Sequence, residues 1–205
     1  MNLQLNLFKN NYIKQMNENE IIAKAQKGDR TALSKLVKMY EQTVYNFAYK
    51  ICRDKEKAEH TMQETFLSMV KSINQFSGKS KLSTWLYTVV SNHCLMMARS
   101  NKKHAYISLD DEDALIDHKN ITDWDIAPDK FAENKELGEI LDEAIKKLAP
   151  EYRVVFMLRD IQGFSTEETA EAIGLSVSAV KSRLHRARAF LRNELNSTFG
   201  YEKRL

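Results

Sequence analysis

The residues best suited to a chemical task lie near the end of the chain, where a turn signal is followed by a run of cations. Residues 165–192 read STEETAEAIGLSVSAVKSRLHRARAFLR. Ser165 and Glu168 have the spacing of a capping box, and Gly174 is the residue type that most easily ends a helix in a left-handed turn. The hydroxyl of Ser176 can then accept a hydrogen bond from the free amides of a second helix. This order of signals predicts a helix-turn-helix.

The second helix of this motif combines an apolar stripe with an excess of positive charge. Four apolar residues recur at helical spacing and are predicted to face inward: Val180, Leu184, Ala187 and Leu191. Between residues 176 and 195, five cations stand against one anion. We expect Arg188 and the following candidate DNA-binding residues to face solvent or DNA: Ser176, Ser178, Lys181, Ser182, Arg183, His185 and Arg186. A merely solvated basic helix is the simpler alternative, but the position of the charge directly behind a complete turn signal favours DNA binding.

Composition narrows the class of protein. The chain has 205 residues and a formal net charge of +3, which suits one domain or two small ones. Because it has only two prolines and six glycines and shows no strand pattern, we predict an all-α fold. No apolar run approaches the roughly 20 residues of a membrane span, and the first residues lack a secretion signal. We therefore expect a cytoplasmic protein without membrane insertion.

Residues that could support catalysis or metal binding do not converge in the sequence. Cys52 and Cys94 are too few for a disulfide framework, so buried reduced thiols are expected. His93 and Cys94 are neighbours on a helix and point about 100° apart, which does not suit one metal ion. His60 and Glu64 share a helical face but have no third catalytic partner. We expect neither an enzyme nor a metal or cofactor site.

The helical periodicity divides the chain into two small helical domains, over 17–105 and 132–198, the second of which contains the helix-turn-helix. They are joined by a flexible acidic linker over 106–131, and an extension over 1–16 and a tail over 199–205 complete the chain. Between Asp110 and Asp129 the linker contains eight acidic residues and one lysine, a net charge of about −7, which leaves about +10 on the remaining residues of the chain. Such a run is typical of a solvated spacer or of a polyanion mimic, and the sequence does not decide between them.

The first domain is predicted to contain four helices, which are separated at Gly28, at Asp54 and at a polar loop that begins near Asn74. The loop offers amide, hydroxyl, aromatic and ammonium groups, a mixture that can hold an extruded base and its phosphate. Trp85 has the spacing of a core residue, whereas Phe76, within the loop, is the better candidate for a nucleic-acid contact.

With these pieces in order, the chain resembles the bacterial sigma factors of the extracytoplasmic-function (ECF) class over roughly residues 20 to 198. The segment AEHTMQETF at 58–66 is similar to the family's A-E-D-x-x-Q-E-x-F, and STWLYTVVSN at 83–92 is similar to its TWL-x-x-I-A-x-N. The segment LAPEYRVVFMLRDIQGFSTEETAEAIGLSVSAVKSRLHRARAFL follows the family pattern throughout. Two positions depart from it: His60 and Met96 stand where the family often has aspartate.

The resemblance implies a sigma factor that binds core RNA polymerase, recognises the minus-thirty-five and minus-ten promoter elements and promotes DNA opening, with an anti-sigma factor as a further partner. It implies polymerase contacts through Glu59, Gln63, Glu64 and Phe66. It implies contacts to the minus-ten element through Asn74, Phe76, Ser80, Lys81, Thr84, Asn92, Arg99, Lys102 and Lys103, and upstream contacts through the helix-turn-helix. The alternative, a helix-turn-helix regulator that binds operator DNA without being a polymerase subunit, does not explain the QETF helix, the basic segment over 99–104 or the acidic linker.

Overall fold

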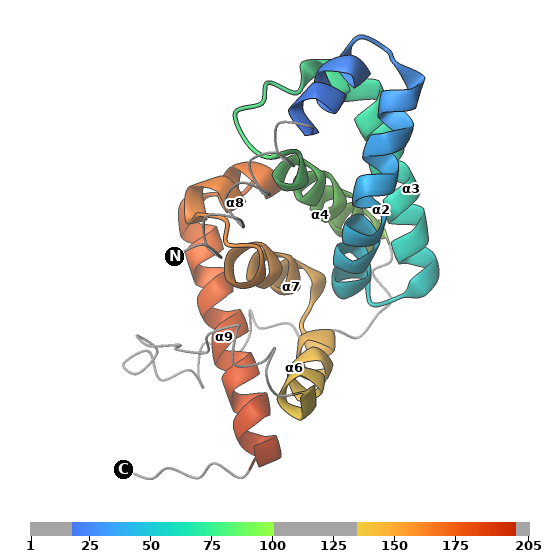
Figure 1. Ribbon diagram of the computed structural model, residues 1–205. Helices are drawn as coiled ribbons and strands as arrows, with labels where there is room; N and C mark the ends of the chain where they lie inside the picture. Colours follow the sequence, from blue (N-terminus) through green and yellow to red (C-terminus); the bar gives the residue numbers. More distant parts are fainter. Residues whose placement is uncertain (1–17, 101–134, 200–205) are drawn as a thin grey trace, which may run out of the picture. The chain divides into compact units, whose positions relative to one another are not determined.

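The computed structural model describes residues 18–100 and 135–199 (Figure 1). Every regular element in these two ranges is a helix, which confirms the all-α prediction. None of the described helices is both long and apolar enough to cross a membrane. The expected linker and terminal segments, together with Lys102 and Lys103, lie outside the described residues.

The described residues form two compact units. The first comprises the residues up to Lys50 together with Asp54–Val90, and the second comprises Ile51–Arg53 together with the residues from Ser91 onward.

The helices of the first unit begin and end where the sequence supplies caps. Its elements are a helix over 18–26, α2 (Arg30–Cys52), α3 (Lys55–Ser72), the 3-10 turn η1 (Ile73–Gln75) and the first part of α4 (Leu82–Ser100). Gly28, at a φ of 87°, allows the chain to turn before α2, and the Asp29 carboxylate accepts a hydrogen bond from the Thr31 amide at 2.8 Å. The Asp54 carboxylate caps α3 by accepting from the Lys57 amide at 2.9 Å.

Apolar side chains at helical spacing form the core of this unit. The buried residues of α2, α3 and α4 include Leu36, Val44, Phe47, Ala58, Met69, Leu82, Leu86 and Val90. The side-chain amide of Gln26 donates to the carbonyls of Ile73 (3.1 Å) and Phe76 (2.8 Å). These two bonds fix the start of the polar loop that follows η1.

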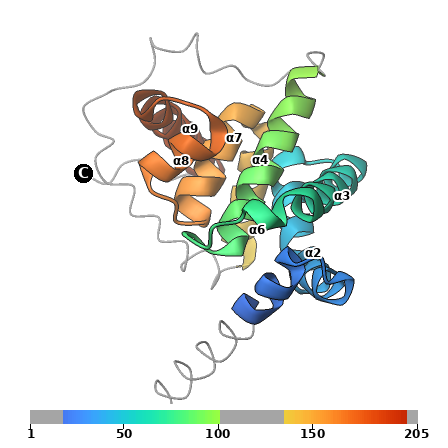
Figure 2. The ribbon, with the colours of Figure 1, turned by 90° about the horizontal axis from the view of Figure 1, so that it is seen from above.

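The second unit contains the C-terminal helices, which surround α9. Its elements are α6 (Lys135–Lys147), α7 (Pro150–Phe156), the π-helical turn η2 (Met157–Ile161), α8 (Thr166–Ile173) and α9 (Val177–Phe199). Helix α9 packs against α6, α7 and α8. Figure 2 shows α9 beside α7 and α8. Apolar residues from these four helices and from η2 fill the space between them, among them Ile145, Val154, Leu158, Ile173, Val180 and Leu191.

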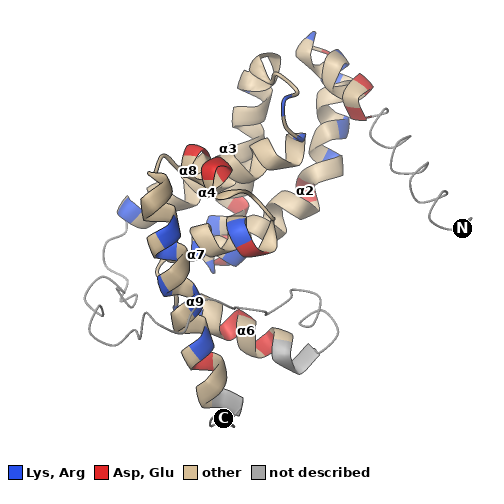
Figure 3. Ribbon diagram, turned by 90° about the vertical axis from the view of Figure 1, so that its left-hand side faces the viewer, with Lys and Arg blue, Asp and Glu red and all other residues tan. Residues whose placement is uncertain are grey.

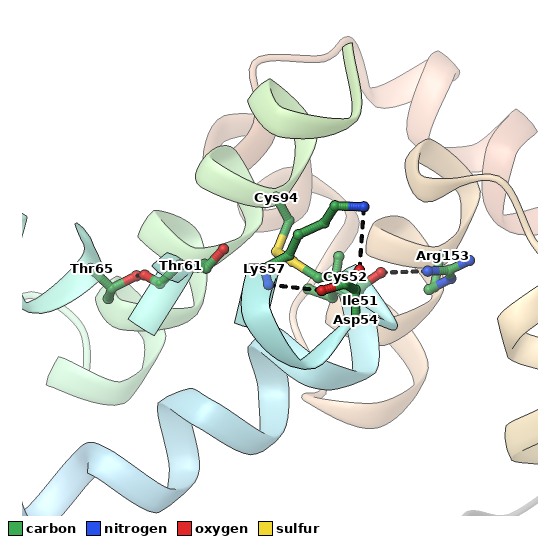
Figure 4. Close-up of a disulfide and its surroundings, with 8 residues drawn as sticks. All are labelled: Ile51, Cys52, Asp54, Lys57, Thr61, Thr65, Cys94 and Arg153. Carbon is green, nitrogen blue, oxygen red and sulfur yellow. Dashed lines mark hydrogen bonds and ion pairs between the residues drawn. A yellow bond between two sulfur atoms is a disulfide. The ribbon is translucent and has the colours of Figure 1, made fainter. Parts of the chain in front are cut away.

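A completely buried arginine holds the turn between α6 and α7. The Arg153 guanidinium donates to the carbonyls of Ile145 (3.0 Å), Lys146 (2.8 Å) and Leu148 (2.6 Å), and also to that of Ile51 (Figure 4). The first three carbonyls end α6, where backbone acceptors lack helical partners and the helix dipole favours a cation. Arg153 therefore serves as a C-terminal cap supplied from the next helix.

The expectation of reduced thiols is wrong in this structure. Cys52, the last residue of α2, and Cys94 on α4 form a disulfide, with their Cα atoms 5.9 Å apart (Figure 4). That separation lies within the usual range for disulfides. The two residues are 42 positions apart, so their pairing depends on how the helices pack and leaves no local signal in the sequence.

Candidate nucleic-acid interface

The helix-turn-helix of the second unit has the caps that its sequence predicts. The Ser165 hydroxyl accepts from the Glu168 amide at 3.0 Å, and the Glu168 carboxylate accepts from the Ser165 amide at 2.6 Å, which completes the capping box of α8. Gly174 ends α8 in the left-handed conformation at a φ of 66°. The Ser176 hydroxyl then accepts from the Ala179 amide at 3.1 Å at the start of α9.

The two faces of α9 separate as expected. The four residues of the predicted apolar stripe are buried, whereas Ser176, Ser178, Lys181 and Ser182 are exposed and Arg183, His185 and Arg186 are partly exposed. Lys and Arg residues recur along α9, and acidic residues lie on α8 (Figure 3). The exposed hydroxyls and cations near the start of α9 can donate to base edges and phosphates.

Arg188, which was expected to face solvent or DNA, is partly exposed and also has a partner within the second unit. Its Nε and Nη2 atoms donate to the two carboxylate oxygens of Asp160 in η2, at 2.8 and 2.5 Å. These hydrogen bonds raise the pKa of the Arg188 guanidinium above its usual value. Both side chains of this ion pair are partly buried, and the pair holds α9 to η2.

A groove of about 350 Å³ between α2 and α3 is the second candidate surface, and it belongs entirely to the first unit. Glu59, Met62 and Gln63 form its α3 wall. Its α2 wall consists of Lys38, Glu41, Gln42 and Tyr45. Sequence reasoning missed the α2 wall, although these four residues recur at the spacing of a single helical face.

The four expected polymerase contacts do not share one environment. Glu59 and Gln63 are exposed in the groove, and Glu64 is partly exposed. Phe66 is only 9% exposed, so its side chain packs in the core beneath α3 and is not part of this surface.

The polar loop after η1 supplies the third candidate surface. Asn74, Ser80 and Lys81 are exposed. Phe76 is partly buried and meets Trp85 edge to face, with 6.4 Å between the ring centroids. Trp85 is also partly exposed, so the core position expected for it is wrong, and its ring contributes to the surface beside the loop.

The remaining candidates lie on α4. Thr84 is partly exposed near its start, and Arg99 is exposed in its last turn. Asn92 is exposed, and its side-chain amide donates to the Ala172 carbonyl at 2.9 Å within the second unit. Met96, which stands where the family often has aspartate, is 59% exposed, so its side chain is not part of the core.

Comparison with known proteins assigns both units. Residues 36–104 match the family model for sigma-70 region 2, and residues 138–191 match that for sigma-70 region 4. The chain is 30% identical over 176 residues to the ECF RNA polymerase sigma factor SigW of Bacillus subtilis, a match that covers 85% of this chain and 94% of the relative. This chain belongs to the ECF sigma factors.

A further relative agrees with this assignment, and two solved structures share the fold. The RNA polymerase sigma factor YlaC of Bacillus subtilis is 28% identical to the ECF sigma factor described here over 169 residues, which cover 82% of this chain and 95% of YlaC. The fold is similar to that of CnrH, solved in complex with the cytosolic domain of CnrY, with a TM-score of 0.56, 23% identity and coverage of 88% and 97%. The sigma factor RpoE of Bartonella quintana, solved with the anti-sigma factor NepR, has a TM-score of 0.52, 20% identity and coverage of 83% and 98%.

The assignment decides between the two functions that the sequence left open. As a sigma factor, the protein acts in promoter recognition and transcription initiation, as a DNA-binding initiation factor. A regulator that binds operator DNA without being a polymerase subunit is not favoured, because the region 2 match accounts for the N-terminal helices as well.

Proposed function

We propose that the three candidate surfaces divide the work of initiation: α9 reads the minus-thirty-five element, the groove between α2 and α3 binds core RNA polymerase, and the loop with α4 captures the opened minus-ten strand. The observation that carries this proposal is the exposed face of α9, because its hydroxyls and cations follow directly on a complete helix-turn-helix. The other two assignments are supported by the groove and by the aromatic pair beside the loop.

The upstream element is read from the first turns of α9. The second helix of such a motif enters the major groove with its N-terminal residues toward the base edges. Lys181 and Arg186 lie in these turns and carry donors suited to guanine, whereas Ser176 and Ser182 can donate to phosphates or bases. Arg192, further along α9, is suited to a phosphate contact.

The polymerase binds in the groove of the first unit. Its lining combines an aromatic ring, a thioether and two amides with a few charges, a composition typical of interface centres. Glu59 and Gln63 supply the polar contacts on one wall, and Tyr45 supplies a large contact area on the other. Phe66 supports this surface by fixing α3 from below.

The opened strand is captured by the polar loop and α4. Unstacked bases bind to aromatic faces, and the partly exposed rings of Phe76 and Trp85 offer such a platform. The ammonium of Lys81 and the guanidinium of Arg99 are suited to contacts with the phosphates of the DNA backbone. Lys102 and Lys103 are further anchors for this backbone. Asn92 joins them once its hydrogen bond to Ala172 opens.

The proposed setting follows from these partners. The protein works without catalysis of its own in the cytoplasm, where core polymerase and promoter DNA are found. An anti-sigma factor is a further proposed partner, since RpoE of Bartonella quintana was solved with one.

The test separates DNA opening from binding. The segment 74–80 is replaced by a Gly-Ser loop of the same length, and permanganate reactivity at the minus-ten element is followed with core polymerase. We expect normal binding to polymerase and to the upstream element, with the minus-ten DNA still closed. The control variant is Leu67→Ala, which changes an exposed residue of α3 and should leave DNA opening unchanged. Open complexes that form at the parental rate after the loop replacement would refute the role of the loop.

A further inference from the structure

The disulfide joins the only two cysteines of the sequence across two helices. Figure 4 shows Cys52 at the junction between α2 and α3, close to Asp54 and Lys57, with Cys94 facing it from α4. The bond closes a chain segment that contains the whole of α3 and the polar loop. The disulfide therefore adds a covalent link between α2 and α4, which would otherwise be held together by packing alone.

The two sulfur-bearing residues differ in their access to solvent. Cys94 is only 3% exposed, whereas Cys52 is partly exposed at the end of its helix. A small oxidant can therefore reach Cys52 first, and Cys94 lies in position to react with it afterward. Susceptibility of cysteines to oxidants depends on access and on thiolate character.

The proposed partner, core polymerase, places the protein among cytosolic reductants, and this step rests on the proposed function. Disulfides in that compartment are usually transient and catalytic or redox-sensing, because small thiols and dithiol proteins reduce them. A bond between the only two cysteines is thus more consistent with a reversible site than with a permanent staple.

We propose that Cys52 and Cys94 form a reversible redox site that is oxidised by hydroperoxides and reduced by small thiols. The Cys52 sulfur attacks the terminal oxygen of the hydroperoxide, so that the O–O bond breaks, the alcohol or water leaves and a sulfenic acid forms. The Cys94 sulfur then attacks the sulfenic sulfur, the S–O bond breaks and water leaves with the thiol proton. One hydroperoxide thus oxidises two thiols to one disulfide.

The consequence of oxidation is greater stability of the helices that carry the minus-ten and polymerase surfaces. Closing a segment of this length restricts the unfolded chain, and the expected rise of the melting temperature on oxidation is about 10 °C. The sigma factor therefore gains resistance to unfolding under the conditions that oxidise it.

The experiment uses the full chain, without polymerase or DNA, so that its outcome does not depend on the proposed function. Protein reduced with dithiothreitol is treated with hydrogen peroxide, and its thiols are counted by N-ethylmaleimide labelling and mass spectrometry. We expect both thiols to be lost together in a monomer, both to return on reduction by glutathione, and the melting temperature to rise and fall with them. Thiols that remain fully labelled, bonds that form only between chains, or an unchanged melting temperature would overturn the proposal.

Two single substitutions test the order of events. In Cys94→Ser, peroxide should leave a sulfenic acid at Cys52 that dimedone traps, whereas in Cys52→Ser the buried Cys94 should react at least about tenfold more slowly. Circular dichroism is used to check that each variant is helical. If a Cys→Ser variant is not helical, the Cys→Ala variant at the same position is tested in its place. Equal reaction rates for the two variants would contradict the assignment of Cys52 as the first thiol to react.

Discussion

The reading surface of the second unit and the groove of the first are built in different ways. The reading surface consists of Ser176 and the exposed face of α9, so it lies on one helix and its N-cap. Besides the buried apolar stripe of α9, polar contacts support it: the Ser165 capping box, the Arg188–Asp160 pair and the buried Arg153. The groove is formed by two helices, which are held together by aliphatic and aromatic packing. A point change can therefore damage the second unit through one unsatisfied polar group, whereas the groove depends on the spacing of two helices.

The largest effect that tests this contrast comes from Arg153. Replacing Arg153 by Met leaves buried carbonyls at the end of α6 without donors, and we expect a loss of about 3 kcal/mol or more in the free energy of unfolding. Lys146→Met is the matched control, since it removes an exposed cation from the same turn and should cost less than about 0.5 kcal/mol. Urea denaturation measures the free energy of unfolding of both variants. Equal costs would mean that the hydrogen bonds of Arg153 add nothing to the apolar packing of the second unit.

The next effect concerns binding of core polymerase. Tyr45→Ala on one wall of the groove and Gln63→Ala on the other should each weaken affinity by about 2 kcal/mol, roughly thirtyfold, if both lie at the centre of the interface. Leu67→Ala, an exposed change on α3 outside the groove, serves as the control. Fluorescence anisotropy with labelled sigma factor gives the affinities. If Gln63→Ala weakened polymerase binding and Tyr45→Ala did not, the interface would be restricted to α3.

The same contrast explains which parts of the site the sequence predicted. The helix-turn-helix lies within residues 165–192, so its caps, turn and buried stripe could be read from local spacing. The α2 wall of the groove was missed because it becomes a surface only when α3 packs beside it. The pairing of Arg188 was missed for a similar reason, since its partner Asp160 is 28 residues away and lies in a π-helical turn.

A smaller effect tests whether one helix carries both specificity and general affinity for DNA. Arg186→Ala should cost about 1 to 3 kcal/mol on the preferred upstream element and relax the preference among sequences. Arg192→Ala should weaken binding to all sequences alike and reduce the salt dependence. Titrations of matched and scrambled duplexes at two salt concentrations distinguish these results. Unchanged specificity and affinity for Arg186→Ala would remove it from the reading surface.

The smallest effect compares the caps of the two units. Asp54 caps α3 through a carboxylate, whereas Ser165 caps α8 through a hydroxyl, and replacing either by Ala should cost about 1 kcal/mol at neutral pH. The backbone amide of Lys57, with help from its ammonium charge, lowers the pKa of Asp54 below its ordinary value of 3.8. A carboxylate whose pKa is lowered in the folded state stabilises that state fully at pH values above its ordinary pKa. This stabilisation is lost as the pH falls through the lowered pKa.

The two caps should therefore respond differently to acid. As the pH falls below 3.8 and through the lowered pKa of Asp54, the cost of Asp54→Ala in the free energy of unfolding should shrink, because the wild-type carboxylate becomes protonated and accepts the Lys57 amide less well. The cost of Ser165→Ala should stay the same, since a hydroxyl does not titrate in this range. Asp54→Asn keeps a capping side chain and should be the less pH-dependent reference. A cost of Asp54→Ala that does not change with pH would show that the ionised carboxylate adds nothing to the cap beyond an acceptor oxygen, and the two units would then cap their helices in the same way.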